Sequence, residues 1–233
     1  MNDWFKWNGE NCTDYGIFVL EQPVITIPKE RSKQTDIPGR PGTLTTLEGD
    51  DVYDEMTLTA TCLIRGPEYI PAIAGWLKGG GTVEFANRPG GFYHARIANQ
   101  IEFEKILRGN PHCTFGVNFR CSPPFWYMND PEDVEITASS CVLVHPGNIY
   151  SEPVITVYGT GDITLIVNDS FIELTGVDGS ITMDSVIQEA YQGEVLQNEK
   201  LKGEFPILKP GNNLVSWTGD VSRLEIQPNW RFL

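Results

Sequence analysis

The strongest pattern in the chain is an almost perfect alternation of apolar and polar residues from Glu55 to Ile64, in the sequence EMTLTATCLI. Threonines occupy one set of positions, and the other set is apolar: Met56, Leu58, Ala60, Cys62 and Ile64. Successive side chains of a strand point to opposite faces of a sheet, so this pattern predicts a half-buried β-strand. The sequence CTFGVNFRC, Cys113–Cys121, repeats the alternation and predicts a second such strand.

The region between these two strands contains both further strands and one helix. Phe92–Ala98 and Ile101–Leu107 are predicted strands. The segment GPEYIPAIAGWLKGGG has helical periodicity instead, with apolar residues on one predicted helix face: Ile70, Ile73, Ala74 and Leu77. A proline is tolerated in the first turn of a helix, and the glycines that follow end it.

The second half of the chain consists of short apolar stretches separated by turn residues. The predicted strands are Val134–Ala138, Val142–His145, Pro153–Tyr158, Ile163–Val167, Phe171–Leu174, Ser180–Met183, Leu214–Trp217 and Arg223–Ile226. The turn sequences GTGD, NDS, GVDG and KPGNN separate many of them at intervals of roughly 8 to 12 residues. This rhythm predicts an antiparallel β-sandwich in which PGNN is a turn between the closing strands and Trp217 lies in the core.

A proline-rich segment, SPPFWYMNDPED, lies between the two halves and is the best candidate for a domain boundary. We therefore expect an N-terminal β domain with one short helix at 1–128 and a C-terminal β-sandwich domain at 129–233. With 233 residues, the chain is long enough for two domains of ordinary size.

The segment 27–55 differs from both halves, because it is polar and has little to bury. It contains the sequence Pro-Gly-Arg-Pro-Gly at Pro38–Gly42. One interpretation is a flexible surface loop. The other is a long arm that becomes ordered only when it lies on a neighbouring subunit. A connection of this length is uncommon in a compact domain unless it is functional, which favours the arm.

Composition and charge narrow the class of protein. Hydrophobic residues make up 40% of the chain, and 31 acidic against 17 basic residues give a net charge of -14. A chain this acidic is unsuited to gripping phosphate backbones, which requires clustered positive charge. The opening sequence MNDWFKWNGENC lacks the apolar run of a signal peptide, and no stretch of about 18 apolar residues predicts a membrane span.

The five cysteines include no CxxC pair, and an odd number cannot pair fully within one chain. This usage is typical of a protein kept reduced in a cytoplasm. Cys62 and Cys121 lie on the apolar side of the two alternating patterns, so we expect them to be buried as small apolar residues.

The sequence contains none of the common catalytic motifs GxSxG, HExxH, the Walker loop or GxGxxG. His94, His112 and His145 lie in unrelated contexts, so we expect no shared metal site. The densest acidic run, Glu48–Glu55, lies in the polar segment, where no apolar cleft would separate the pKa values of a catalytic pair. We therefore expect no catalytic residue, no cofactor and no metal.

A series of short motifs follows in order along nearly the whole chain. They are WFKWNG followed by DYGIFV, then IPGRPG, WLKGGG, FRCSPPFWY, EPVITVYGTGDITLIVN and FPILKPGNNLVSWTG. In this order and spacing they resemble the siphophage distal tail protein (Dit) family, which forms the tail-tip or baseplate hub of phages and prophages of Gram-positive bacteria.

The resemblance implies a mainly β fold, with an N-terminal ring-forming domain, an extended belt arm and a C-terminal galectin-like antiparallel β-sandwich. It also implies a homo-hexameric hub ring at the distal end of the tail tube, with each belt reaching the adjacent subunit. The belt would correspond to Asp36–Asp51. The residues expected in this subunit-interface arm are Asp36, Pro38, Gly39, Arg40, Pro41 and Gly42.

Partners and location follow from the same resemblance. One face of the ring would meet the tail tube protein, and the other the tail-associated lysin, the baseplate hub or receptor-binding proteins. DNA would pass through a central channel without specific binding, because an acidic lining repels its backbone. The protein would be made and assembled in the cytoplasm of the host bacterium and would reside at the tail tip of the virion, without membrane insertion.

Aromatic residues near the chain ends and the domain border leave an alternative function open. They are Trp4, Phe5, Trp7, Phe125, Trp126, Tyr127, Trp217 and Trp230. Such rings either stack on sugars, as in carbohydrate-binding sandwiches, or pin chain ends onto a core. The alternative is therefore a carbohydrate-binding β-sandwich module that recognises host cell-wall polysaccharide, and a glycosidase with two carboxylates is a third class. Neither class has a use for the polar arm.

Overall fold

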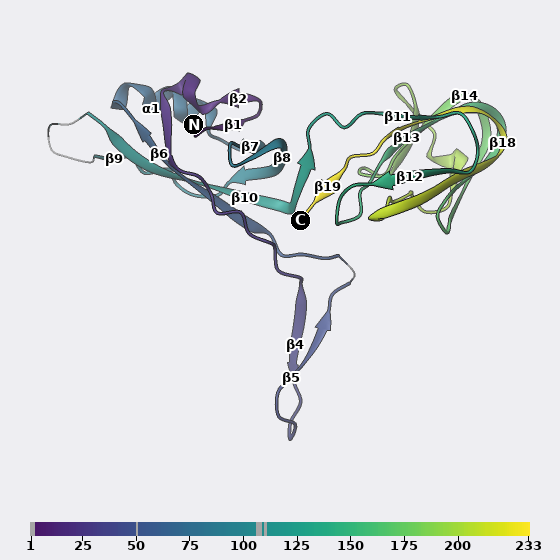
Figure 1. The fold of residues 1–233 in the computed structure, drawn as a ribbon, viewed down its shortest axis with the longest axis horizontal. Coiled ribbons are helices and arrows are strands. Elements are labelled where there is room, and N and C mark those ends of the chain that lie inside the picture. The colour runs from purple at the N-terminus through teal and green to yellow at the C-terminus, as the bar shows by residue number, and fades with distance from the viewer. Residues whose placement is uncertain (1–2, 50, 106–108, 110) are drawn as a thin grey trace. The chain divides into compact units, whose positions relative to one another are not determined.

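The structure is a computed structural model that describes residues 3–49, 51–105, 109 and 111–233. The chain forms two compact units, Met1–Asn129 together with Leu233, and Asp130–Phe232 (Figure 1). Both units are built from antiparallel strands, so the prediction of a mainly β fold is confirmed. Within the described residues, no helix has the length and apolar character needed to cross a membrane.

The first unit is built around an antiparallel sheet in the order β2-β1-β7-β8-β10-β6-β3, with β9 beside β10. The strands are β1 (Phe5–Trp7), β2 (Glu10–Asn11), β3 (Ile17–Glu21), β6 (Met56–Ile64), β7 (Gly80–Phe85), β8 (Arg88–Ile97), β9 (Glu104–Lys105) and β10 (Cys113–Met128). β6 and β10 carry the two alternating patterns, and they pair from Cys113 opposite Ile64 to Cys121 opposite Met56. The two predicted strands therefore exist and are neighbours.

The start of the predicted strand at Ile101–Leu107 is wrong, because the described strand begins at Glu104. Among the described residues of this segment, Glu104–Lys105 pairs with β10, and positions 106–108 lie outside the described residues. The side chain of Asn99 provides the reason: its Oδ1 accepts from the Asn118 N–H at 2.8 Å, and its Nδ2 donates to the Gly116 carbonyl at 3.0 Å. These bonds occupy backbone groups of β10 that a neighbouring strand would otherwise use.

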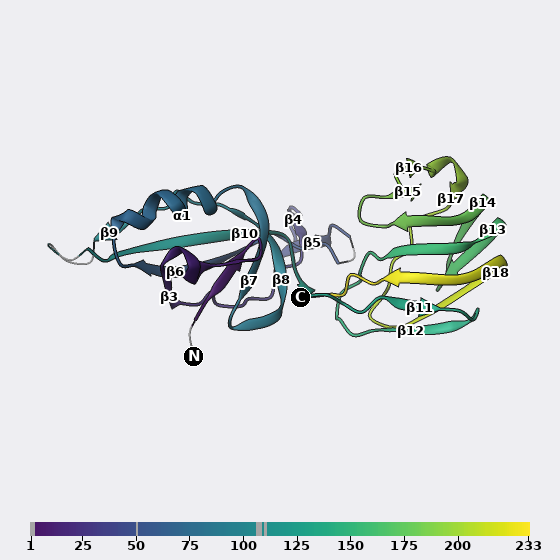
Figure 2. The same cartoon turned by 90° about the horizontal axis from the view of Figure 1, so that it is seen from above.

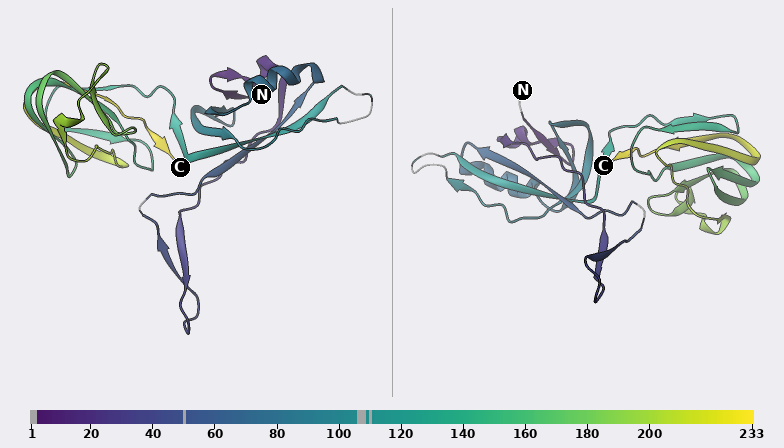
Figure 3. Two further views of the ribbon diagram at one scale, coloured as in Figure 1. Left: turned by 180° about the vertical axis from the view of Figure 1, so that it is seen from behind. Right: turned by 60° about the horizontal axis from the view of Figure 1, so that its bottom comes forward.

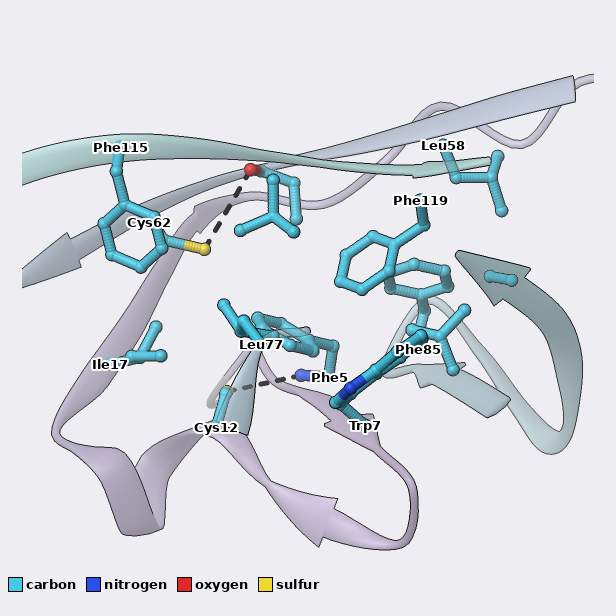
Figure 4. Close-up of a cluster of buried hydrophobic side chains, with 14 of the residues drawn as sticks. Phe5, Trp7, Cys12, Ile17, Leu58, Cys62, Leu77, Phe85, Phe115 and Phe119 are labelled. Carbon is cyan, nitrogen blue, oxygen red and sulfur yellow. Dashed lines mark hydrogen bonds between the residues drawn. The ribbon is translucent and has the colours of Figure 1, made fainter. Parts of the chain in front are cut away.

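The apolar residues of the sheet form the core of the first unit. Figure 4 shows aromatic rings from β1, β7 and β10 meeting there. The ring centroid of Phe119 lies 5.4 Å from that of Phe5, 5.6 Å from Trp7 and 5.5 Å from Phe85. Cys62 and Cys121 are fully buried, as the alternation predicts, and all five cysteines are free.

The helix α1 (Ile70–Trp76) covers this apolar side of the sheet (Figure 2). Ile73 is fully buried, as predicted, but Ala74 is exposed and Trp76 is buried instead. The Trp76 Nε1–H donates to the Trp7 carbonyl at 3.3 Å. A helix of seven residues contacts the sheet through little more than one turn, so one large ring replaces the wider apolar stripe. Short 3-10 helices complete the described elements: η1 (Cys12–Tyr15), η2 (Pro67–Tyr69) and η3 (Asn198–Lys200).

The second unit is a β-sandwich made mainly from three long strands that lie side by side in the order β18-β13-β14 (Figure 2). They are β13 (Val154–Val167), β14 (Ser170–Asp184) and β18 (Gly211–Gln227). β13 is antiparallel to both neighbours. Val154 at its start lies opposite Asp184 of β14 and Gln227 of β18, and Val167 at its end lies opposite Ser170 of β14 and Val215 of β18. Shorter strands complete this sheet: β11 (Val134–Ile136), β12 (Cys141–His145), β15 (Glu189–Gln192), β16 (Val195–Leu196) and β17 (Leu201–Lys202). The two-residue strand β19 (Arg231–Phe232) follows β18 in the chain and is not part of this sheet.

The long strands correct the sequence prediction, which placed turns at GTGD and GVDG. Both sequences lie inside continuous strands, and the pairing of β13 with β14 shifts register between Gly161 and Ile163. Glycines permit close approach of the chains there. A Cβ at Gly159 would lie 2.2 Å from the Asp220 carbonyl oxygen, and a Cβ at Gly219 would lie 2.6 Å from that of Asp162. The strands therefore bend where the sequence suggests that they stop.

The closing segment also differs from the prediction. Trp217 is only half-buried, whereas Trp230 is 8% exposed and its ring lies 4.5 Å from that of His145. Trp217 lies next to the bend in β18 and not in the middle of the apolar layer. PGNN is not a turn between two strands of the sheet, because β18 begins at Gly211 within it. The described segment just before PGNN forms an isolated β-bridge, between Leu208 and Ser151.

Candidate assembly interface

The polar segment folds into a separate two-stranded hairpin, seen below the sheet of the first unit in Figure 1 and from two further directions in Figure 3. Its strands are β4 (Ser32–Asp36) and β5 (Thr43–Leu47), paired from Ser32 opposite Leu47 to Asp36 opposite Thr43. In the described chain, these strands pair only with each other. Every residue described between 33 and 49 is exposed.

The residues predicted for the subunit-interface arm gather at the tip of this hairpin. Asp36 ends β4, and the Arg40 N–H donates to the Ile37 carbonyl at 3.1 Å. Gly39 and Gly42 have φ values of 80° and 81°, which glycine adopts without steric cost. A Cβ at either glycine would meet no atom within 4 Å, so the tip is fully open to a partner.

The base of the hairpin is fixed to the first unit. The Arg31 N–H donates to the Val52 carbonyl at 2.8 Å, and Arg31 Nε lies 3.2 Å from the Asp54 carboxylate. The Tyr53 ring lies edge-on to Phe125, with centroids 6.0 Å apart. Burial and the nearby carboxylates of Asp51 and Glu30 raise the pKa of Tyr53 above its ordinary value. The arm therefore starts from a defined point on the unit.

Exposed apolar side chains on and before the arm are the feature that sequence reasoning missed. Val24 and Ile27 are 80% and 82% exposed, and Leu44 and Leu47 on the hairpin are 47% and 54% exposed. An isolated two-stranded hairpin is marginally stable in water, and this one buries little. The apolar members of TLTTL, Leu44 and Leu47, were the available signal, but the polar composition of the segment hid it.

The histidines and the acidic run of the sequence lie in separate environments. In the part of the chain that the structure describes, no three His, Cys, Asp or Glu side chains gather closely enough to hold a metal ion. His94 lies on the sheet of the first unit, whereas His145 is buried in the second. Within the acidic run, Asp54 pairs with Arg31 and Glu55 pairs with Arg120 at 3.4 Å.

The aromatic residues that could stack on sugars are all at least half-buried. Fully or nearly fully buried are Phe5, Trp7, Phe125 and Trp230. Half-buried are Trp4, Trp126, Tyr127 and Trp217. Two of the half-buried rings have partners in the first unit: the Arg88 guanidinium lies 5.0 Å from the Trp126 ring, and Tyr127 stacks on Phe92 at 5.6 Å. Burial at these positions favours the interpretation in which the rings pack onto the protein.

The architecture defines a class of protein: a mainly β chain of two units, with one short helix and a protruding hairpin in the first unit and a bent-strand sandwich as the second. Among solved structures, the chain is similar to the Dit protein (gp 19.1) of SPP1, described as a paradigm of the hub adsorption apparatus in phages that infect Gram-positive bacteria. The TM-score is 0.81 at 16% sequence identity, and the match covers 100% of both chains.

The likeness establishes that this chain has the Dit fold, as its motifs predict. No protein-family model matches the chain, and no curated protein sequence matches it either. The evidence for the fold is therefore structural similarity.

Proposed function

We propose that this chain is a structural protein of a phage tail, and that it forms a homo-hexameric hub ring at the distal end of the tail tube. The observation that carries the proposal is the full-length match to the fold of a phage hub protein. The exposed hairpin adds independent support, because an isolated two-stranded hairpin is marginally stable and would gain stability by packing on another subunit.

In this proposal the hairpin is the contact between neighbouring subunits. A closed ring repeats one pair of complementary surfaces around its axis. The hairpin supplies one such surface: its tip residues Asp36 and Arg40 are exposed, and Leu44 and Leu47 offer apolar area for burial on a neighbour. Pro38 and Pro41 restrict the free tip, which reduces the entropy lost when it is ordered against the next subunit.

The ring would link the tail tube protein on one face to the tail-associated lysin, the baseplate hub or receptor-binding proteins on the other. DNA would leave through the central channel without specific binding, because a chain with a net charge of -14 repels a phosphate backbone. The role is mechanical, and the protein would be assembled in the host cytoplasm and carried at the tail tip of the virion.

The test removes the hairpin and measures assembly. Ser32 and Leu47 are direct cross-strand partners, so replacing 33–46 by an Asn-Gly turn preserves the base of the arm. We expect the native mass of a hexamer and ring-shaped particles for the wild type, and a folded monomer for the excised variant. The measurements are light scattering and negative-stain microscopy.

A matched control replaces the turn residues Gly193–Glu194, between β15 and β16, by Asn-Gly and should leave the rings intact. Rings formed by the excised variant would contradict the role of the hairpin. A wild type that remains a monomer in isolation and also fails to join purified tail tubes would contradict the hub itself.

A further inference from the structure

The side of the first unit's sheet that faces away from α1 is polar and carries charges of opposite sign at its two ends. On β10, the buried side chains are the odd-numbered residues from Cys113 to Cys121, so Thr114, Gly116, Asn118 and Arg120 point to this other side. We call this side, formed by these four residues and their cross-strand neighbours, the polar outer face. No described helix covers it, since α1 packs on the apolar side.

The positive end is a groove of about 440 Å³ in which two arginines are direct cross-strand partners, Arg96 on β8 and Arg120 on β10. Gly80 on β7 lies opposite Arg96 and adds no side chain, which leaves the groove open beside the guanidinium. His94 lines the same groove one step along β8. Like charges directly opposite each other in a sheet repel, so this pair is unfavourable in the isolated chain.

Only part of this positive charge is neutralised within the chain. Glu55 lies 3.4 Å from Arg120, and both side chains are about half exposed, at 52% and 54%. Among the described residues, Arg96 has no carboxylate oxygen within 4.0 Å. The groove therefore has an exposed guanidinium that would gain from an external carboxylate.

The negative end is a second groove, of about 390 Å³, that lies further along the same face of β10. Glu102 and Glu104 line it, and Glu104 is the cross-strand partner of Thr114. Its floor includes Gly116, where an added Cβ would meet no atom within 4 Å. Glu21 lies at its border and accepts a hydrogen bond from Thr61 at 3.1 Å.

We propose that the polar outer face is a docking surface for a second copy of this chain, with the arginine groove of each copy against the glutamate groove of the other. Arg120 and Thr114 lie three residues on either side of Val117, about 10 Å along the strand in each direction. A two-fold axis that runs parallel to the face, perpendicular to β10 and level with Val117, exchanges the two ends of the face. It therefore places Arg96 and Arg120 of one copy over Glu104 of the other. Both contacts form at once, so the face is self-complementary.

A second copy fits this face better than a nucleic acid does. A phosphate backbone that reached Arg96 would extend along the face toward Glu102 and Glu104, which repel it. A partner needs carboxylates at one end and cations at the other, spaced as on this chain, and a second copy provides both. The contact goes beyond the ring proposed above, since it involves neither strand of the hairpin.

The experiment makes two charge-reversal variants, Arg96→Glu/Arg120→Glu and Glu102→Lys/Glu104→Lys, both in the full chain and in the hairpin-excised chain, which lacks the ring contact through the hairpin. Sedimentation velocity at low ionic strength measures their association, and circular dichroism checks that both are folded. Each variant alone should associate at least about tenfold more weakly than the wild type, because like charges then face each other. An equimolar mixture should regain association, since one variant presents an acidic face and the other a basic face. The wild-type contact should weaken as salt rises from about 0.05 to about 0.5 M.

A milder pair of variants protects the test against misfolding. Gly116→Lys places an amine in the glutamate groove where the backbone has room, and it should weaken association, while Gly116→Ser should not. Wild-type association by either charge-reversal variant alone would overturn the inference, as would a mixture that fails to recover. Duplex DNA binding that competes with association through Arg96 would overturn it as well. If only excision of the hairpin abolishes assembly, the inference falls and the proposed ring stands.

Discussion

Arg231 and Glu152 form an ion pair in the second unit, with Arg231 Nη1 2.8 Å from the Glu152 carboxylate and only 4% of the arginine side chain exposed. The Arg231 Nε–H also donates to the Tyr150 carbonyl, and the guanidinium lies 4.3 Å from the Tyr150 ring. A buried guanidinium has lost its hydration, so its carboxylate partner matters for stability.

Replacing that carboxylate tests this dependence. Glu152→Gln should lower the free energy of unfolding by about 2 to 3 kcal/mol, somewhat less than for a fully buried pair, because Glu152 is 31% exposed. Glu173→Gln is the control, since its pair with Lys202 at 3.2 Å is largely exposed and should contribute less than about 1 kcal/mol. Urea denaturation measures both variants, and equal losses would contradict the role of burial.

The stability of the second unit should depend on the protonation of His145. Burial, and to a lesser extent the charge of Arg231, lowers the pKa of His145 to about 4. In the unfolded chain its pKa is about 6.5, so between pH 6.5 and 4 the unfolded state binds the proton more readily. This contribution to stability is present above pH 6.5 and is lost as pH falls toward 4, on the order of 1 kcal/mol per pH unit.

The variant His145→Asn isolates this effect. The Gly147 N–H donates to His145 Nδ1 at 2.8 Å, and an asparagine oxygen can accept the same bond without titrating. Urea denaturation at several pH values should therefore show a shallower loss of stability for the variant below pH 6.5. Identical pH dependence in the two proteins would exclude His145 as the source.

A side chain at Gly159, at the bend of the sandwich strands, should lower the stability of the fold. Its added Cβ would lie 2.2 Å from the Asp220 carbonyl oxygen, so Gly159→Ala should cost about 1 to 3 kcal/mol as the strands shift apart. Gly161→Ala provides the comparison, because it has a φ of 78° but no atom within 4 Å of the added Cβ. It should cost about 1 kcal/mol from backbone strain alone. Thermal unfolding ranks the two, and a smaller effect at Gly159 would contradict the steric argument.

Thiol labelling should distinguish the cysteines by burial. Burial raises the pKa of the Cys121 thiol to about 12 and raises the pKa values of Cys12 and Cys62 as well, so little reactive thiolate forms at neutral pH. Cys141 is only partly buried. We expect one fast-reacting thiol with a maleimide reagent in the native protein and five after denaturation. Cys141→Ser should remove the fast reaction; a fast reaction that persists would assign it to another cysteine.

The polar hairpin shows why the candidate site was only half predictable. Length, proline and glycine content marked 27–55 as an arm, and the structure places Asp36–Gly42 together at its tip. The pairing of Ser32 with Leu47 and the exposure of Leu44 depend on which strands meet, and composition does not specify that. The opposition of Arg96 and Arg120 is likewise invisible in sequence, because it arises from the register of two strands.

By itself, the sequence determined the features that depend on neighbouring residues. The alternation in Glu55–Ile64 and Cys113–Cys121 specified two half-buried strands, because the two-residue period of a strand is a local property. Tertiary structure alone decided whether GTGD and GVDG end a strand or bend it: these two segments pair with each other as parts of β13 and β14, and β18 pairs with β13 on its other side. It also decided which charges share a face and which tryptophan is buried. These outcomes depend on register and on packing between distant segments, and no local pattern encodes them.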